Sequence, residues 1–229
     1  LREETIFDIA SLTKVVATTT AVMLLLRDKA IALDDPIHKY VPEFPNEQIT
    51  FIHLLTHSAG FPDHLPLYED VQREADRQGS DFVGSPAAKQ FVIEKVCQTD
   101  LLYPPGEQDI YSDLGFILLG HAIEKIAGTT LDQYCAERIF APLGMSATFF
   151  RKHGDPLRGG EYAATERCEW RRRILCGEVH DENAYAMGGV AGHAGLFSTL
   201  DDMHIFMRMI YHCYQGQDDF MPAPLVRQF

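Results

Sequence analysis

A run of twelve residues without a charge, from Val15 to Leu26, constrains the fold of this chain more than any other feature. The run stands between Lys14 and Arg27 and is rich in Ala, Val, Leu and Met, which predicts a helix that begins near Ser11 and enters a hydrophobic core. A membrane-spanning helix needs about 20 apolar residues, and this run is shorter and contains three threonines. We therefore expect a buried helix and no membrane segment in this chain.

The remaining composition is that of an acidic globular protein. The 229 residues include 33 Asp and Glu against 20 Lys and Arg, and the formal net charge of −13 works against binding to a phosphate backbone. Nucleic acid is therefore not an expected partner. Five cysteines cannot all pair within one chain, so at least one thiol is expected to be free. No Cys or His spacing indicates zinc, and we expect neither a metal nor another cofactor.

Helical patterns and turns dominate the rest of the sequence. Strand patterns are scarce, and the two candidates are residues 146–150 and 173–179. Residues 63–84 are expected to form a loop, and the glycine-rich stretch that ends at Gly195 is expected to be largely irregular. Further helices are predicted at residues 49–57, 86–98, 114–127, 130–140 and 200–212.

The motif Ser11-x-x-Lys14, at the start of the apolar helix, occurs once in the sequence. Side chains three residues apart share one face of a helix, so Lys14 can take the proton that Ser11 must lose to become a nucleophile. The helix N-terminus adds backbone N–H donors and positive potential where an acyl oxyanion would develop. The alternative is that Ser11 only caps the helix while Lys14 reaches solvent. The four-residue pattern by itself leaves both interpretations open.

A second motif, Tyr111-Ser112-Asp113, follows a proline-rich turn and precedes another apolar helix, although its tyrosine could also be a packing residue. Together the two motifs resemble the serine β-lactamase and penicillin-binding-protein superfamily, specifically its class-C-like branch of D-alanyl-D-alanine carboxypeptidases, β-lactamases and esterases. Residues 179–192 look most like carboxypeptidases of the penicillin-binding type. The blocks similar to the family's, in order, are residues 7–14, 53–60, 105–106, 111–116, 142–145 and 192–199.

The resemblance implies a role for three side chains. Ser11 would be the acyl-accepting nucleophile, Lys14 its proton partner, and Tyr111 the phenol that relays the proton to the leaving group and then activates water. Asp113 departs from the family pattern, which usually has an amide at this position. Its charge would favour the ammonium form of Lys14, shift the role of base toward Tyr111, and remove a donor to the substrate carbonyl.

The resemblance also implies an α+β fold of the serine β-lactamase/DD-peptidase type. The family places strands of a central antiparallel sheet before Ser11 and after the last helix, and neither set is recognisable here. We therefore expect residues 1–229 to form one domain that is mostly the helical portion, with much of the sheet missing and with both ends incomplete.

The family's third motif, Lys/His-Thr/Ser-Gly on an inner strand, has one candidate match in Gly192-His193-Ala194-Gly195. This segment leads into a Ser/Thr-capped helix, whereas the motif should lie on a strand deep in the C-terminal part. We interpret it as a glycine-rich turn near the site, in which His193 and Gly195 contribute to substrate binding or to the surroundings of the catalytic residues.

Three other groups of residues are candidate binding sites. His53 and His57 have the i, i+4 spacing of metal ligands, but no third ligand is identifiable and structural packing is favoured. Residues 180–183 could bind a cation or line a cleft, although a loop network is favoured. The basic cluster within residues 167–173 could attract a carboxylate, although a solvated face paired with the glutamates at 166 and 169 is favoured.

We therefore predict a serine hydrolase that forms an acyl-enzyme with an amide or an ester. A D-alanyl-D-alanine peptide of peptidoglycan is the first substrate expected, with carboxylesterase and β-lactamase activities as alternatives. A non-catalytic fragment or binding module is the alternative from another class, supported by the missing sheet and opposed by the presence of Ser11, Lys14 and Tyr111. The segment alone is expected to turn over poorly or not at all. The family resemblance implies a periplasmic or cell-envelope location, and the oligomeric state is left undetermined.

Overall fold

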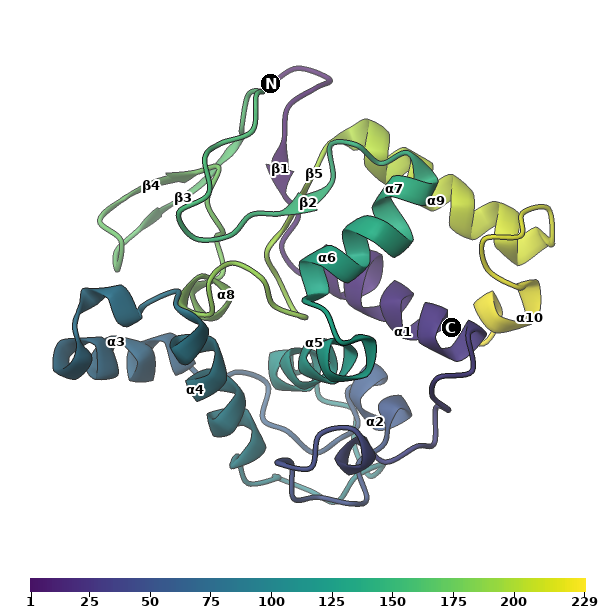
Figure 1. Cartoon of the computed structure of the whole chain (residues 1–229), viewed down its shortest axis with the longest axis horizontal. Helices are drawn as coiled ribbons and strands as arrows, with labels where there is room; N and C mark the ends of the chain where they lie inside the picture. Colours follow the sequence, from purple (N-terminus) through teal and green to yellow (C-terminus); the bar gives the residue numbers. More distant parts are fainter.

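The apolar run after Lys14 forms the central helix of the molecule (Figure 1). The computed structural model describes residues 1–229, and in it this helix consists of a π-helical segment, η1 (Lys14–Thr19), that continues into α1 (Thr20–Arg27). Within it the Thr20 hydroxyl donates to the Val15 carbonyl, five residues back, at 2.9 Å. The predicted burial is confirmed by side chains with no exposed surface at Ala17, Ala21, Val22 and Leu24.

Helices make up most of the remaining regular structure (Figure 1). They are α2 (Phe51–Leu55), α3 (Leu67–Gln78), α4 (Pro86–Cys97), α5 (Asp113–Ala127), α6 (Leu131–Cys135), η4 (Ala136–Phe140), α7 (Ala141–Leu143), α8 (Glu182–Ala186), α9 (Leu200–Gln215) and α10 (Ala223–Val226), with short 3₁₀ turns at Ile37–Lys39 and Ser80–Phe82. The strands are β1 (Phe7–Asp8), β2 (Phe149–Phe150), β3 (Ala164–Cys168), β4 (Arg173–Cys176) and β5 (Leu196–Ser198).

A small antiparallel sheet lies beside the start of the central helix (Figure 1). Its middle strand is β5, with β1 on one side and β2 on the other, so that Phe7 is opposite Ser198 and Phe149 is opposite Phe197. A separate antiparallel hairpin consists of β3 and β4. The expected α+β fold is confirmed, and the two strands predicted from sequence correspond to β2 and β4 in shorter form.

The expectation of a loop over residues 63–84 is wrong, because this stretch contains the twelve-residue helix α3. Only Leu67 and Val71 of α3 are buried, so the apolar periodicity that reveals a helix is weak. The helix is supported instead by pairs of opposite charge one turn apart, such as Arg73 with Glu69 at 3.7 Å.

The expectation of largely irregular structure up to Gly195 is wrong in part, because strand β3, which pairs with the predicted strand at β4, and the short helix α8 lie within it. Two other elements near the site escaped the sequence analysis because they are very short. β1 has two residues and β5 has three, all of them buried in β5, so neither carries an alternating pattern that a sequence could reveal.

Close contact between α5 and the glycine-rich turn holds the site region together. A Cβ atom on Gly192 would lie 2.0 Å from the Phe116 carbonyl oxygen and 3.0 Å from the backbone nitrogen of Gly120, so glycine is required for this approach. This contact fixes the glycine-rich turn against a helix that is itself almost wholly buried.

No single helix is long and apolar enough to cross a membrane. The test of length and composition is met only by α5 taken together with the helical segment Leu131–Leu143, and these two meet at a bend of 76°. None of the five cysteines forms a disulfide, so the expectation of at least one free thiol is confirmed.

Candidate active site

Ser11 and Lys14 meet at the first turn of the central helix, where Lys14 Nζ donates a hydrogen bond of 2.9 Å to Ser11 Oγ. Ser11 is exposed, whereas the Lys14 side chain is only 4% exposed, so Lys14 does not reach solvent as the capping interpretation required. The backbone N–H of Ser11 donates to no protein acceptor. The first turn therefore presents an accessible hydroxyl, a buried cation and a free N–H donor together.

The turn that delivers Ser11 to this position is held by Asp8. One carboxylate oxygen of Asp8 accepts from the backbone N–H of Ala10 at 2.8 Å, and the other accepts from the backbone N–H of His180 at 2.7 Å. Ala10 has φ +45°, a left-handed conformation that is strained for alanine and precedes Ser11 directly. Burial raises the pKa of Asp8, against the hydrogen bonds from His180 and Ala10, which lower it.

The Lys14 ammonium has three acceptors for its three N–H bonds. Besides Ser11 Oγ, these are Asp113 Oδ1 at 2.7 Å and the main-chain carbonyl oxygen of His193 at 3.2 Å. An ammonium has no lone pair, and here Lys14 acts as a hydrogen-bond donor to all three acceptors. The arrangement therefore favours Lys14 as a cation that polarises its neighbours rather than as the initial base.

Tyr111 lies beside Lys14 with its ring rather than its hydroxyl. The ammonium nitrogen is 4.8 Å from the centroid of the Tyr111 ring, a cation–π contact, and the Tyr111 hydroxyl makes no hydrogen bond to Ser11 or Lys14. The side chain is 54% exposed. The structure thus brings Tyr111 to the Ser11–Lys14 pair while leaving its hydroxyl free.

The His57 ring packs against the ring of Tyr111. The two rings are 4.4 Å apart between centroids, and His57 Nδ1 accepts a hydrogen bond of 3.0 Å from the backbone N–H of Ser112. Burial and the positive charge of Lys14 lower the pKa of His57, in that order. The ring is therefore neutral at neutral pH, and His57 was recognised from sequence as packing but not as the support for Tyr111.

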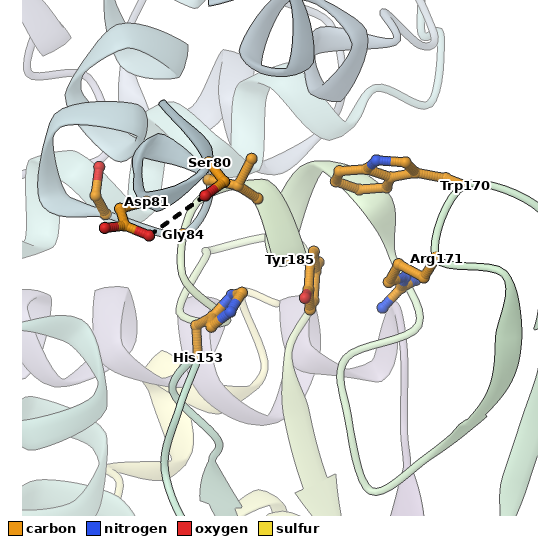
Figure 2. Close-up of a pocket in the computed structure, with 9 residues that line it drawn as sticks. Ser80, Asp81, Gly84, His153, Trp170, Arg171 and Tyr185 are labelled. Carbon is orange, nitrogen blue, oxygen red and sulfur yellow. Dashed lines mark hydrogen bonds between the residues drawn. The ribbon is translucent and has the colours of Figure 1, made fainter. Parts of the chain in front are cut away.

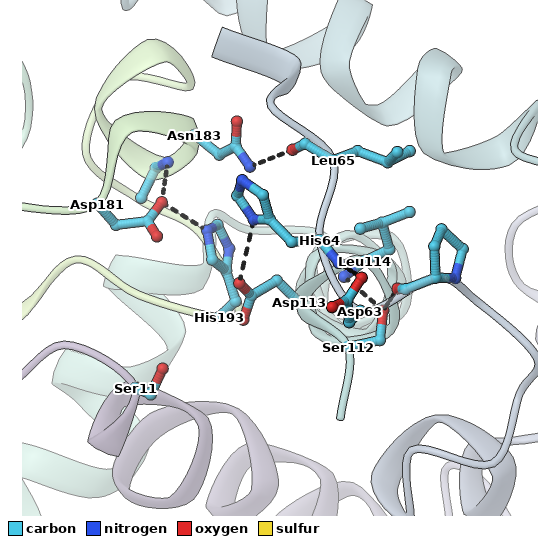
Figure 3. Close-up of polar contacts among 12 residues, drawn as sticks. Ser11, Asp63, His64, Leu65, Ser112, Asp113, Leu114, Asp181, Asn183 and His193 are labelled. Carbon is cyan, nitrogen blue, oxygen red and sulfur yellow. Dashed lines mark hydrogen bonds and ion pairs between the residues drawn. The ribbon is translucent and has the colours of Figure 1, made fainter. Parts of the chain in front are cut away.

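Asp113 reaches Lys14 because it is the first residue of α5. Ser112 caps this helix: its hydroxyl oxygen accepts from the backbone N–H of Leu114 at 3.3 Å and donates to the carbonyl of Pro62 at 2.6 Å. Near the site, His64 Nδ1 lies 4.0 Å from the second carboxylate oxygen of Asp113, as Figure 3 shows. His64 was not singled out in the sequence.

Hydrogen bonds made by Thr13 and Thr18 hold the turn from Gly192 to Gly195 against the central helix. The hydroxyl of Thr18 donates to the Gly192 carbonyl at 2.6 Å, and the hydroxyl of Thr13 accepts from the backbone N–H of Leu196 at 3.1 Å. Gly195 has φ +112°, and a Cβ there would lie 2.3 Å from the carbonyl oxygen of Gly189. The structure therefore places a glycine-rich turn beside the Ser11–Lys14 pair, directly followed by β5.

His193, in the middle of this turn, has an acidic partner that the sequence did not identify. Its Nε2 lies 2.9 Å from Asp181 Oδ1, and the same oxygen accepts from the backbone N–H of Ala184 and so caps α8 (Figure 3). Asn183 makes further loop contacts, donating to the Leu65 carbonyl at 2.9 Å and accepting from the backbone N–H of Tyr68 at 2.8 Å. The favoured interpretation of residues 180–183 as a loop network agrees with these contacts.

The interpretation of the basic cluster as a solvated face is wrong for Arg171. Its side chain is 3% exposed, and its guanidinium donates to the main-chain carbonyls of Val179 and His180. Glu178, and neither of the expected glutamates, is the carboxylate that pairs with Arg173, through two bonds of 2.7 Å. The cluster therefore braces the segment that leads to Asp181.

Two other groups of residues do not form a metal site. Ligand atoms of Glu166, Cys168 and Glu182 lie within 4.8 Å of one another, but Arg171 Nε lies 3.4 Å from Cys168 Sγ, and a guanidinium there opposes a metal cation. His53 belongs instead to the cap of α2, where its Nδ1 accepts from the backbone N–H of Thr50 at 3.3 Å.

A cavity of about 540 Å³ opens beside Tyr185 of α8 (Figure 2). It is also lined by His153, Trp170 and Arg171, and by none of Ser11, Lys14 or Tyr111. The Arg171 guanidinium lies 4.4 Å from the centroid of the Tyr185 ring, so Arg171 already makes a cation–π contact with this aromatic side chain.

Comparison with known proteins places the chain among relatives of matching fold. It matches the Beta-lactamase family over residues 1–227. It is 36% identical over 247 aligned positions to an Escherichia coli K12 protein named "Putative D-alanyl-D-alanine carboxypeptidase", covering 98% of this chain and 55% of that protein. The chain thus spans about half the length of the curated relatives it matches.

Solved structures of penicillin-binding proteins have a similar fold. A penicillin-binding protein from Bacillus halodurans aligns with a TM-score of 0.76 at 22% identity, over 99% of this chain and 65% of that one. An octameric penicillin-binding protein homologue from Pyrococcus abyssi aligns with a TM-score of 0.71 at 26% identity, over 98% of this chain and 48% of that one.

Proposed function

The chain belongs to the beta-lactamase family, and on that premise we propose that it is the Ser11-bearing part of a serine hydrolase that works through an acyl-enzyme. The observation that carries this proposal is the contact of the exposed Ser11 hydroxyl with the buried Lys14 ammonium. A purely structural lysine at this depth would not need a solvent-facing serine as a partner.

In the first half of the proposed reaction, Ser11 Oγ attacks the substrate carbonyl carbon. Its proton is relayed through the Tyr111 hydroxyl toward the leaving group, and Lys14 is not the acceptor because it already donates all three of its own protons. The Ser11 N–H can donate to the developing oxyanion. Tyr111 then gives the proton to the leaving amine or alcohol as the carbonyl carbon–leaving group bond breaks, and the acyl group stays on Ser11.

In the second half, water attacks the acyl carbon. Tyr111 takes a proton from that water and delivers it to Ser11 Oγ as the ester bond breaks, so Ser11 leaves as the free hydroxyl and the acyl group is released as a carboxylic acid. Both halves require the Tyr111 hydroxyl to come within hydrogen-bond distance of Ser11 Oγ, and such bonds often tighten only once substrate is bound.

A D-alanyl-D-alanine peptide is the first substrate we propose, because the relatives are named "Putative D-alanyl-D-alanine carboxypeptidase". Carboxylesterase is the second candidate, and Asp113 is the observation that favours it. A carboxylate cannot donate to a substrate carbonyl as an amide can, and an ester needs less leaving-group activation than an amide. β-Lactam hydrolysis is the third proposed activity. The proposed binding partners are therefore small-molecule substrates or peptidoglycan peptides.

The test of this proposal is the site of covalent labelling. The protein is treated with a fluorophosphonate and with a penicillin, and peptide mass spectrometry should place the adduct on Ser11. Ser11→Ala should abolish the adduct, while Ser80→Ala, which changes an exposed serine elsewhere, should leave it unchanged. Labelling that persists in Ser11→Ala would refute the proposal, and a protein that never labels would favour a non-catalytic module.

The substrate class is separated by a parallel assay. A chromogenic ester, a cephalosporin and a D-alanyl-D-alanine peptide are compared by kcat/KM on the same preparation. The highest kcat/KM for the peptide supports the carboxypeptidase proposal, whereas turnover confined to the ester supports the carboxylesterase.

A further inference from the structure

We propose that Asp181 is a positioning residue that acts on Lys14 through His193. This inference rests on the proposed function and adds to it a group that never touches substrate. The chain of contacts runs from the Asp181 carboxylate to the His193 imidazole, and from the His193 main-chain carbonyl to the Lys14 ammonium.

The first step is that Asp181 alone anchors the His193 side chain. The imidazole is 1% exposed, its Nε2 lies 2.9 Å from Asp181 Oδ1, and its buried Nδ1 has no partner. A buried imidazole with one hydrogen bond loses its only polar contact when Asp181 is removed, and leaving such a group unsatisfied is costly. The ring would then reorient, and the backbone of His193 would move with it.

The second step is that movement of His193 reaches Lys14 directly. The His193 carbonyl oxygen accepts the third N–H of Lys14 at 3.2 Å, and it is the most distant of the ammonium's three acceptors. When this acceptor is displaced, the ammonium is held by Ser11 and Asp113 alone. The 2.7 Å contact with Asp113 then draws the ammonium away from Ser11.

The third step is that the rest of the turn does not depend on Asp181. Thr18 holds the Gly192 carbonyl and Thr13 holds the Leu196 N–H, so both flanks of His193 stay fixed to the central helix. Removing Asp181 therefore disturbs the middle of the turn and not the fold. This separates a positioning role from a merely structural one.

The charge of Asp181 agrees with this arrangement. Burial would raise its pKa, but the charge and hydrogen bond of His193, the Ala184 N–H and the charge of Lys14 outweigh burial and lower it. The carboxylate is therefore ionised across the working pH range and always available as an acceptor.

A second task of Asp181 must be kept apart in the test, because the same oxygen caps α8 by accepting from the Ala184 N–H at 2.7 Å. Serine is a good helix cap, but its shorter side chain cannot also reach His193. Asparagine keeps both the cap and an oxygen acceptor for His193. Asp181→Ser thus removes positioning and keeps the cap, whereas Asp181→Asn keeps both.

The experiment measures two quantities: the rate constant for acylation of Ser11 by a fluorophosphonate, and the ¹⁵N chemical shift of Lys14 Nζ. The Lys14 signal is identified as the one that disappears from the spectrum of Lys14→Arg. Asp181→Ser should slow acylation by roughly 10-fold to 100-fold, the scale expected for a small misplacement of a catalytic group, and should shift the Lys14 signal. Asp181→Asn should restore both. Ser85→Ala, which removes the cap of α4, should lower the melting temperature without slowing acylation.

An unchanged Lys14 signal in Asp181→Ser overturns the proposal whatever the activity, and so does Asp181→Asn behaving like Asp181→Ser. If the wild type fails to label at Ser11, the proposed function is wrong, while the Lys14 signal still decides whether Asp181 positions Lys14.

Discussion

The Lys14 ammonium lies closer to the carboxylate of Asp113, at 2.7 Å, than to the hydroxyl of Ser11, at 2.9 Å. Asp113 is 18% exposed, so solvent screens this ion pair only in part. The ion pair fixes the position of Lys14 at the expense of its availability as a base. The electrostatics of the site therefore depend on Asp113.

We expect Asp113→Asn to shift the pH–rate profile of acylation. Replacing the carboxylate by an amide removes the negative charge that Lys14 contacts at 2.7 Å, so the pH dependence of the step that uses Lys14 and Tyr111 should change. The profile is measured with a chromogenic ester from pH 5 to pH 10. Asp109→Asn, which changes an exposed carboxylate in the loop before α5, is the matched control and should leave the profile in place. An unmoved profile in Asp113→Asn would show that Asp113 does not couple to the reacting pair.

The sequence pointed to Ser11, Lys14 and Asp113 as candidate site residues because they occur in short motifs with fixed spacing, and the structure brings these three side chains together. Ser11 and Lys14 share a helix face, and Asp113 begins an apolar helix, so local geometry carries most of the information. Asp181 could not be assigned in the same way. Its partner His193 lies twelve residues further along, across a helix and a glycine-rich turn, and only the folded chain brings the two together.

The same distinction explains what was missed in the fold. The helices α1, α5 and α9 can be recognised from apolar runs or caps, whereas α3 is stabilised largely by surface charges and β5 is too short to show a period. The assignment of Arg171 to a solvated face failed because burial of a guanidinium depends on main-chain carbonyls that a sequence does not display.

We expect Tyr111→Phe to slow deacylation by about 10²–10⁴-fold, the usual contribution of a general base. The side chain is exposed and its hydroxyl has no partner, so stability should hardly change. Acylation uses the same hydroxyl and should slow as well, so the formation and the decay of the acyl-enzyme are followed separately by intact-protein mass spectrometry after mixing with an ester. Tyr211→Phe, an exposed tyrosine on α9, serves as the control. Deacylation within threefold of wild type would assign the base elsewhere.

The stability of the protein should fall as the pH drops below about 6.5, the ordinary pKa of histidine, in part because of His57. Burial lowers the pKa of His57 in the folded state, so the unfolded chain binds the proton more readily. The stability from the neutral ring is therefore present above the unfolded pKa and is lost as the pH falls through the lowered, folded-state pKa.

His57→Asn tests this linkage, since asparagine tolerates the left-handed backbone at this position, φ +58°. The free energy of unfolding in urea is compared for both proteins at pH 8 and pH 5. The wild type should lose more of its stability between these two values than His57→Asn does. Equal losses would show that His57 does not titrate differently on folding.

The tightest backbone approach near the site should tolerate no side chain. A Cβ on Gly192 would lie 2.0 Å from the Phe116 carbonyl oxygen, and neither backbone can yield without moving α5 away from the central helix. We expect Gly192→Ala to destabilise the fold by about 3 kcal/mol or more, as overpacking of a rigid contact does. The movement should also displace the neighbouring His193 carbonyl from Lys14, so the acylation rate of the folded fraction should fall. Gly159→Ala is the matched control, because nothing lies within 4 Å of a Cβ there, and it should be nearly neutral in urea unfolding. A Gly192→Ala protein with the stability and acylation rate of Gly159→Ala would mean that α5 and the turn are not in rigid contact.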